Sequence, residues 1–258
     1  MPRPDPIDMA KFAAAKRAVD YVEDGMRVGL GTGTTAGWMI RALGELVRDG
    51  LKVRGVPTSA RTKALAEAAG IPLASLDEAR WLDLTIDGAD EFDGDLNLVK
   101  GGGGALLHEK IVATASDVMV VIADASKRVD TLGAFPLPVE VVPFGWRTTQ
   151  ALVEEFLVGM DVDAREATLR MDRDGAPART DEGNLLLDLH LGRIGNPGQV
   201  ARALNQVPGV VETGLFLDIC DVVVTGAADG TVEVRDVGAG TVTRETVDLG
   251  ADANIFTD

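Results

Sequence analysis

The sequence has one cysteine, Cys220, only two histidines and no long apolar run. A single cysteine excludes an internal disulfide framework and a metal site built from clustered cysteines. No stretch approaches the roughly 18 apolar residues of a membrane-spanning helix. The proline-rich start, Met1 to Pro6, is not followed by an apolar core, which argues against a secretory signal. These absences predict a cytoplasmic protein that contacts no membrane.

Positive charge is also scarce. The sequence has 25 Lys and Arg residues and 41 Asp and Glu residues, which gives a net charge of -16. A protein that binds nucleic acid needs a basic surface to neutralise phosphates, so this class of partner is excluded. If the substrate is a phosphate ester, a few lysines and helix N-termini must make its site locally positive.

Strands and helices alternate through the first half of the 258 residues. The expected elements are a helix at 11–24, a strand at 27–30, a helix ending at 48, a strand at 51–56, a helix at 59–69, a strand at 82–86, a helix at 105–116 and a strand at 118–123. This alternation predicts an α/β fold, with a doubly wound, mostly parallel sheet.

The order changes after Asp130. Strands at 138–144, 167–171, 185–191 and 210–216, with helices at 146–158 and 197–206, give the order βαββαβ. That order is typical of a ferredoxin-like α+β domain. We therefore expect a catalytic α/β domain of residues 1–132 and 217–258, with a ferredoxin-like domain of residues 133–216 inserted into it. A strand at 221–225 and a hairpin around Asp229-Gly230 resume the first domain, and residues 238–258 show no readable pattern.

The segment from Gly31 to Ala36 (GTGTTA) lies between an expected strand and helix. Its glycines permit a tight turn, and the free N–H groups of the next helix can bind an anion, with hydroxyls from Thr34 and Thr35. A dinucleotide site would need an acid at the end of the second strand, where the sequence has Val56 to Ser59 instead. A phosphate pocket is the better interpretation, and a plain capped turn is the alternative.

Three carboxylates, Asp87, Asp90 and Glu91, follow the strand at 82–86. Open α/β sheets bind ligands at this end of their strands. The cluster fits a divalent metal site, acid–base work on sugar hydroxyls, or a charged surface turn. The residues by themselves do not decide between these.

A run of four glycines, 101–104, stands between Lys100 and a helix that carries Glu109. Such a run costs conformational entropy, which indicates a need for close backbone approach. A base on the helix could be held rigidly near a substrate carbon, and Lys100 could offset charge on substrate oxygens. Lys127, on the loop after the strand at 118–123, could reach the Thr34–Thr35 turn. His108 and His190 are expected to be packing or surface residues.

In order and at matching spacing, the strings GLGTGTTA, TIDGADE, NLVKGGGGALLHEK, DASKRV, PVEVVPF and PGVVETGLF resemble the A-type ribose-5-phosphate isomerase family over about residues 10–237. The resemblance implies a metal-free and cofactor-free aldose–ketose isomerase of the pentose phosphate pathway. A member of this family would interconvert D-ribose 5-phosphate and D-ribulose 5-phosphate, and we would expect it to assemble as a homodimer or homotetramer.

The resemblance also implies roles for individual residues. Glu109 would be the general base, Asp87 would assist ring opening and hydroxyl proton movement, and Asp90 and Lys100 would complete the catalytic set. Positions that match phosphate-binding or substrate-lining residues are Lys11, Thr32, Gly33, Thr34, Thr35, Gly101, Gly103 and Lys127. His108 departs from the arginine common before the base, and the segment 145–149 departs from the family pattern.

Two rival functions stay open on the residues alone. One is a metal-dependent sugar isomerase at the carboxylate cluster, which a chelator would inactivate. The other is a non-catalytic sugar-phosphate sensor, which could keep the Thr34–Thr35 pocket without needing Glu109.

Overall fold

A computed structural model describes residues 5–249 of the protein. These residues form two compact units. Unit 1 contains the residues up to Gly88, Ile111–Lys127 and the residues from Cys220 on, and unit 2 contains Ala89–Lys110 and Arg128–Ile219. Besides residues 133–216, unit 2 contains residues 89–110, 128–132 and 217–219. Within residues 5–249, no helix has both the length and the apolar character needed to cross a membrane.

Unit 1 is built on a seven-stranded sheet with the strand order β14-β13-β12-β6-β3-β1-β2. Its strands are β1 (Arg27–Leu30), β2 (Arg54–Pro57), β3 (Leu84–Gly88), β6 (Met119–Asp124), β12 (Val222–Gly226), β13 (Thr231–Asp236) and β14 (Thr241–Thr246). Neighbours from β12 to β2 are parallel, while β13 and β14 are antiparallel additions. All six residues of β6 are buried, as expected for a central parallel strand covered on both faces.

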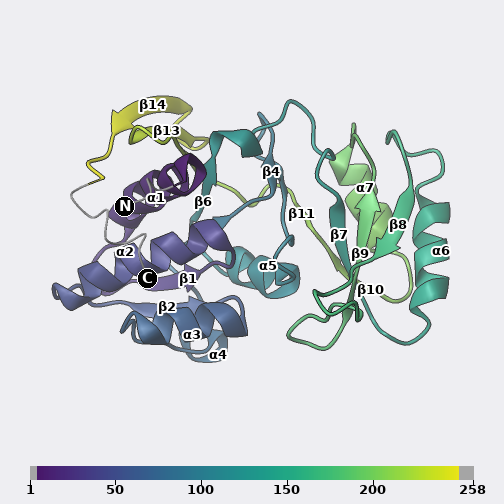
Figure 1. Ribbon diagram of the computed structural model, residues 1–258, viewed down its shortest axis with the longest axis horizontal. Helices are drawn as coiled ribbons and strands as arrows, with labels where there is room; N and C mark the ends of the chain where they lie inside the picture. Colours follow the sequence, from purple (N-terminus) through teal and green to yellow (C-terminus); the bar gives the residue numbers. More distant parts are fainter. Residues whose placement is uncertain (1–4, 250–258) are drawn as a thin grey trace. The chain divides into compact units, whose positions relative to one another are not determined.

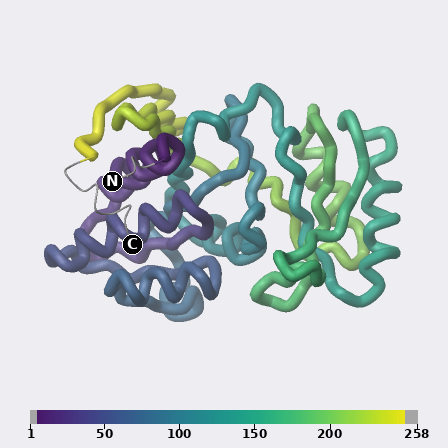
Figure 2. The backbone as a smooth tube through the Cα atoms, viewed as in Figure 1, coloured from purple at the N-terminus to yellow at the C-terminus, as the bar shows by residue number. Residues whose placement is uncertain are grey.

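Helices pack on this sheet. They are α1 (Pro6–Ala18), α2 (Thr34–Arg48), α3 (Ala60–Ala68) and α4 (Leu76–Ala79), with short 3-10 turns η1 (Val19–Tyr21) and η2 (Ala125–Lys127). The chain from β12 to β14 returns beside the N-terminal helix α1 (Figure 2). Three consecutive alanines, Ala13 to Ala15, are fully buried, so α1 can approach the sheet closely. Ser59 is the N-cap of α3, because its hydroxyl oxygen accepts from the Thr62 N–H at 3.0 Å.

The ferredoxin-like order is confirmed within unit 2. Its four-stranded antiparallel sheet has the order β10-β7-β9-β8, with helices α6 and α7 packed beside it (Figure 1). The elements are β7 (Leu137–Val141), α6 (Trp146–Phe156), β8 (Glu166–Leu169), β9 (Leu185–His190), α7 (Pro197–Leu204) and β10 (Val210–Thr213). Leucines and valines of β7 and β9 form the core of this unit.

A small three-stranded sheet in unit 2 was not predicted. It consists of β4 (Glu91–Phe92), β5 (Leu98–Val99) and β11 (Leu215–Phe216), in the order β11-β5-β4. The single strand expected at 210–216 is therefore wrong. It breaks at Gly214, where an added Cβ would lie 2.2 Å from the Lys100 carbonyl oxygen. Helix α5 (Leu106–Thr114) follows the glycine run, and the division between the two units falls inside it.

The C-terminal part also differs from expectation. The hairpin at Asp229-Gly230 is confirmed as the β12–β13 turn. Beyond it, β14 forms from residues that show no readable pattern in the sequence, and all six of its residues are exposed. Its strand character comes from pairing with β13 along its full length, because an exposed strand buries too little apolar surface to leave a clear hydrophobic signal.

Candidate functional site

In unit 1, three chemistry-bearing segments meet at one edge of the sheet. Strands β1, β3 and β6 are parallel neighbours, so their carboxyl ends place residues 31–35, Asp87 and residues 124–127 along the same edge. Ligands of open α/β sheets bind at this edge. Helix α2 begins there at Thr34, and Gly33 caps it with a φ of 120° that favours glycine. Thr34 is exposed and Thr35 is half-buried, so the helix N-terminus can receive an anion.

Thr32 belongs to the scaffold of this edge. Its hydroxyl lies 2.7 Å from that of Thr58, 2.8 Å from that of Ser59 and 2.9 Å from that of Thr62. Its backbone N–H donates to Asp87 Oδ1 at 3.0 Å. Thr32 thereby connects the glycine turn to the Asp87 carboxylate.

Asp87, at the end of β3, is fully buried. Its Oδ1 accepts from the N–H of Thr32 and, at 2.7 Å, from that of Gly88. Gly31 provides the room, since a Cβ there would lie 2.1 Å from Asp87 Oδ1. The glycine of the predicted phosphate turn is thus also required by the carboxylate beside it.

The two candidate phosphate lysines lie in different elements of unit 1. Lys127 ends η2, directly after β6, and is half-buried. Lys11 lies in α1, where its ammonium is 3.6 Å from Asp8, and the two side chains are 16% and 44% exposed. Helix α1 packs against α2, β6 and β12.

Unit 2 holds the second group of candidate residues, centred on a buried ion pair. Lys100 Nζ lies 3.2 Å from Glu109 Oε1, with the side chains 2% and 5% exposed. Lys100 follows β5 and its N–H donates to the Gly214 carbonyl at 2.8 Å. Glu109 stands in the first turn of α5. Burying two charges costs desolvation free energy even when they are paired. A pair of this kind therefore indicates a functional role.

The glycine run connects the two members of this pair. Gly101 and Gly104 have φ values of 100° and 82°, which only glycine adopts readily. The Gly102 N–H donates to Asp90 Oδ2 at 2.7 Å, so Asp90 orients the run. Of the predicted residues, unit 2 therefore brings together Asp90, Lys100, Gly101 and Glu109, along with Gly103 on the same run.

Sequence reasoning missed two residues beside this pair. Lys110 Nζ lies 2.8 Å from Glu212 and donates to the Thr213 carbonyl at 2.6 Å. Burial lowers the pKa of Lys110, and the hydrogen bond that its ammonium donates to Glu212 opposes that shift. The Phe216 ring lies 5.4 Å from the Lys100 ammonium and 4.9 Å from that of Lys110. Phe216 ends the string PGVVETGLF, which resembles the family pattern but was given no functional role. That string is the sequence feature that could have identified Phe216.

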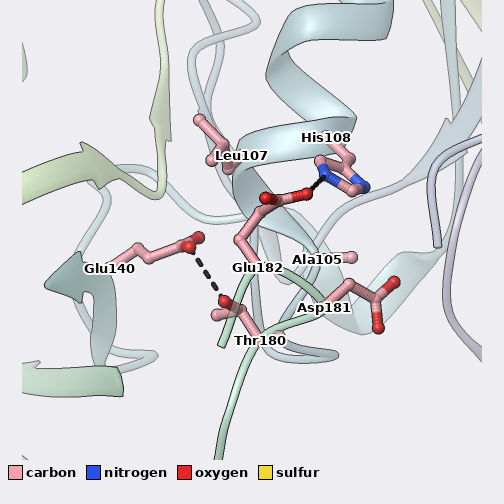
Figure 3. Close-up of a pocket in the computed structure, with 8 residues that line it drawn as sticks. Ala105, Leu107, His108, Glu140, Thr180, Asp181 and Glu182 are labelled. Carbon is pink, nitrogen blue, oxygen red and sulfur yellow. Dashed lines mark hydrogen bonds and ion pairs between the residues drawn. The ribbon is translucent and has the colours of Figure 1, made fainter. Parts of the chain in front are cut away.

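His108, expected to be a packing or surface residue, pairs with Glu182 at 2.8 Å (Figure 3). The two side chains line a small pocket with Glu140, Thr180 and Asp181. Its empty space, with open solvent included, is only about 180 Å³. We therefore do not assign the substrate to this pocket.

Glu91, the third carboxylate of the predicted cluster, faces a loop of its own unit. Its two oxygens accept from the N–H groups of Gly133 at 2.7 Å and Phe135 at 2.5 Å. Glu91 thus anchors the segment before β7. Across residues 5–249, no group of three or more His, Cys, Asp or Glu side chains has a geometry that could hold a metal ion.

Known proteins resemble the chain over nearly its whole length. The family model described as ribose 5-phosphate isomerase A (phosphoriboisomerase A) matches residues 54–230. A curated protein of Ruegeria pomeroyi, named ribose-5-phosphate isomerase A, is 69% identical over 254 residues, which are 98% of this chain and 97% of that protein.

Solved structures agree with this. Ribose 5-phosphate isomerase A of Methanocaldococcus jannaschii is 42% identical, with a TM-score of 0.81 over 89% of this chain and 98% of that one. A D-ribose-5-phosphate isomerase in complex with phospho-erythronic acid is 40% identical, with a TM-score of 0.82 over 89% and 99%. They confirm both the predicted fold class and the resemblance seen in the motifs: this chain belongs to the ribose 5-phosphate isomerase A family.

Proposed function

We propose that this protein interconverts D-ribose 5-phosphate and D-ribulose 5-phosphate by proton transfer through an enediolate, as a step of the pentose phosphate pathway. The observation that carries the proposal is the buried Lys100–Glu109 pair at 3.2 Å behind a run of four glycines, in a member of this family. A carboxylate held so rigidly suits the removal of a proton from carbon.

The proposed proton path starts from the open-chain aldose. Glu109 takes the proton from C2, and the electrons of the C2–H bond form the C1–C2 double bond of the enediolate. The electrons of the C1 carbonyl π bond move to O1, and the hydroxyl proton of O2 passes to O1, so that C2 becomes the carbonyl carbon. Glu109 then returns its proton to C1, where the electrons of the C1–C2 double bond form the new C1–H bond of the ketose. The Lys100 ammonium stabilises the negative charge that develops on the oxygens. Asp87 is assigned to ring opening and hydroxyl proton movement, and Asp90 to holding the glycine run.

The phosphate group of the substrate is assigned to residues of unit 1. A phosphate monoester carries nearly two negative charges near neutral pH. The N-terminus of α2, with Thr34 and Thr35, supplies N–H and hydroxyl donors, and Lys127 and Lys11 supply positive charge. This local arrangement resolves the conflict between an anionic substrate and the net charge of -16.

Assembly and location belong to the proposal as well. We propose a homodimer or homotetramer that works in the cytoplasm, as the family resemblance implies. Gel filtration with light scattering would give the assembly state.

The decisive experiment is turnover of ribose 5-phosphate in deuterated water with a chelator present. Proton transfer through Glu109 places deuterium on C1 of the ribulose 5-phosphate, because the carboxylic acid exchanges with solvent. We expect full activity with chelator and label at C1. Loss of activity with the chelator would favour the metal-dependent isomerase, and absence of any turnover would favour the sugar-phosphate sensor.

A further inference from the structure

A side chain from the ferredoxin-like part of unit 2 forms hydrogen bonds with the backbone of the glycine run. Arg170, directly after β8, donates from Nη1 to the carbonyl oxygens of Gly101 at 2.9 Å and Gly102 at 3.2 Å. The other edge of the guanidinium meets Asp188, with Nε 2.9 Å from Oδ2 and Nη2 paired to Oδ1. The Arg170 and Asp188 side chains are only 17% and 19% exposed. One planar group thus connects strand β9 to the loop.

The opposite side of the loop is held by a carboxylate. The Gly102 N–H donates to Asp90, and a Cβ at Gly102 would lie 2.6 Å from Asp90 Oδ1. The Gly104 N–H turns back to the Gly101 carbonyl at 3.0 Å. Within residues 5–249, the N–H groups of Gly101 and Gly103 make no hydrogen bond. With the carbonyls fixed by a cation, these two N–H groups keep one orientation and can serve as donors to a ligand.

We propose that Arg170 is a positioning residue that pre-organises the Lys100–Gly104 loop for the sugar, an inference that rests on the proposed function of this site. A run of glycines is the most flexible backbone a chain can have, so ordering it on substrate binding would cost free energy. Arg170 prevents that cost by holding two successive carbonyls before the substrate arrives. It touches no reacting atom.

The shape of the guanidinium is essential to this role. Its planar fork presents donors on two edges at once, whereas the ammonium of lysine is a single point charge. Lysine at position 170 could keep an ion pair with Asp188, but it could not also bind both carbonyls in the same geometry. Substitution by lysine therefore separates loop positioning from a simple ion-pair contribution to stability.

Unit 2 offers a matched control. Arg193 pairs with Asp161 and Asp163, and it makes no contact with the glycine run. Arg193→Met removes an arginine–carboxylate contact of the same chemistry from the same unit. A fall in kcat/KM that Arg170→Met and Arg193→Met share is due to the loss of an ion pair. Any larger fall in Arg170→Met is due to the loss of its contacts with the glycine run.

The test combines steady-state kinetics with amide hydrogen exchange on Arg170→Lys, Arg170→Met and Arg193→Met. A displacement of about 1 Å in an active site can cost a hundredfold in rate, so we expect kcat/KM to fall roughly ten- to a hundredfold in both Arg170 variants and to stay within about twofold in Arg193→Met. The hydrogen-bonded amides of Gly102 and Gly104 should exchange faster in Arg170→Lys than in the parent protein, although the thermal midpoint of this variant is nearly unchanged.

Restoration of both kcat/KM and slow exchange by Arg170→Lys would overturn the proposal, as would equal effects of the Arg193 and Arg170 variants. Arg170→Lys keeps the test possible if Arg170→Met does not fold. If the parent protein shows no turnover of ribose 5-phosphate, the proposed function fails. The exchange of the Gly102 and Gly104 amides still decides whether Arg170 orders the loop.

Discussion

Replacement of Glu109 by glutamine changes both the chemistry and the stability of the site. At an effective dielectric constant of about 20, opposite unit charges 3.2 Å apart attract each other by about 5 kcal/mol. Desolvation of the buried pair offsets part of this, and removing one partner of such a pair costs about 3–5 kcal/mol of stability. Because the amide oxygen of glutamine can still accept from Lys100, we expect the lower end of that range, about 3 kcal/mol, by chemical denaturation.

The effect of Glu109→Gln on turnover should be larger than its effect on stability, and the two can be measured separately. Loss of a general base lowers turnover by roughly 10²–10⁴-fold, which corresponds to about 2.7–5.5 kcal/mol of transition-state stabilisation. Steady-state kinetics on protein that denaturation curves show to be folded would measure it, together with deuterium incorporation from solvent. The affinity for inorganic phosphate, which we assign to unit 1, should hardly change.

A matched control separates the two effects. Glu212 pairs with Lys110, the residue after Glu109, at 2.8 Å, so Glu212→Gln weakens a neighbouring ion pair of the same unit. We expect Glu212→Gln to lose stability while its turnover stays within about threefold of the parent protein. Near-normal turnover in Glu109→Gln, or an equal loss in both variants, would refute Glu109 as the base.

Three further predictions follow from unit 1. Lys127→Ala should raise KM for ribose 5-phosphate about tenfold with little change in kcat, because uniform substrate binding is lost; a fall in kcat alone would contradict phosphate binding by Lys127. Gly31→Ala should lower the thermal midpoint, since its Cβ would lie 2.5 Å from the Asp87 Cα and overpacking costs about 1–3 kcal/mol; an unchanged midpoint would disprove the close approach. Hydrogen bonds from Arg27 lower the pKa of Asp83, so this carboxylate stabilises the fold above its unfolded pKa near 3.8 and loses that effect as pH falls through the lowered value. Asp83→Asn should therefore be less stable than the parent protein at pH 7, and the difference should shrink as the pH falls below 3.8, as urea denaturation across this range would show.

Local sequence patterns predicted most of the fold. The alternation of apolar strands and amphipathic helices led to the parallel sheet, and the βαββαβ order led to the ferredoxin-like sheet with order β10-β7-β9-β8. Both signals are local, because strand and helix periodicity are properties of a few consecutive residues. The errors occurred where pairing partners decide the outcome, as at Gly214, where an apparently continuous strand divides between two sheets.

For the candidate site, too, some features could be predicted from local sequence and others depend on tertiary contacts. The sequence by itself predicted which residues would carry chemistry: a glycine run between a lysine and a helix, and carboxylates at the end of a buried strand. Only the tertiary structure decided what these residues touch. It buries Lys100 against Glu109, joins Thr32 to Asp87 across 55 positions and brings Arg170 to Gly101 across 69. Such contacts depend on how distant elements pack, and no periodicity within one segment encodes them.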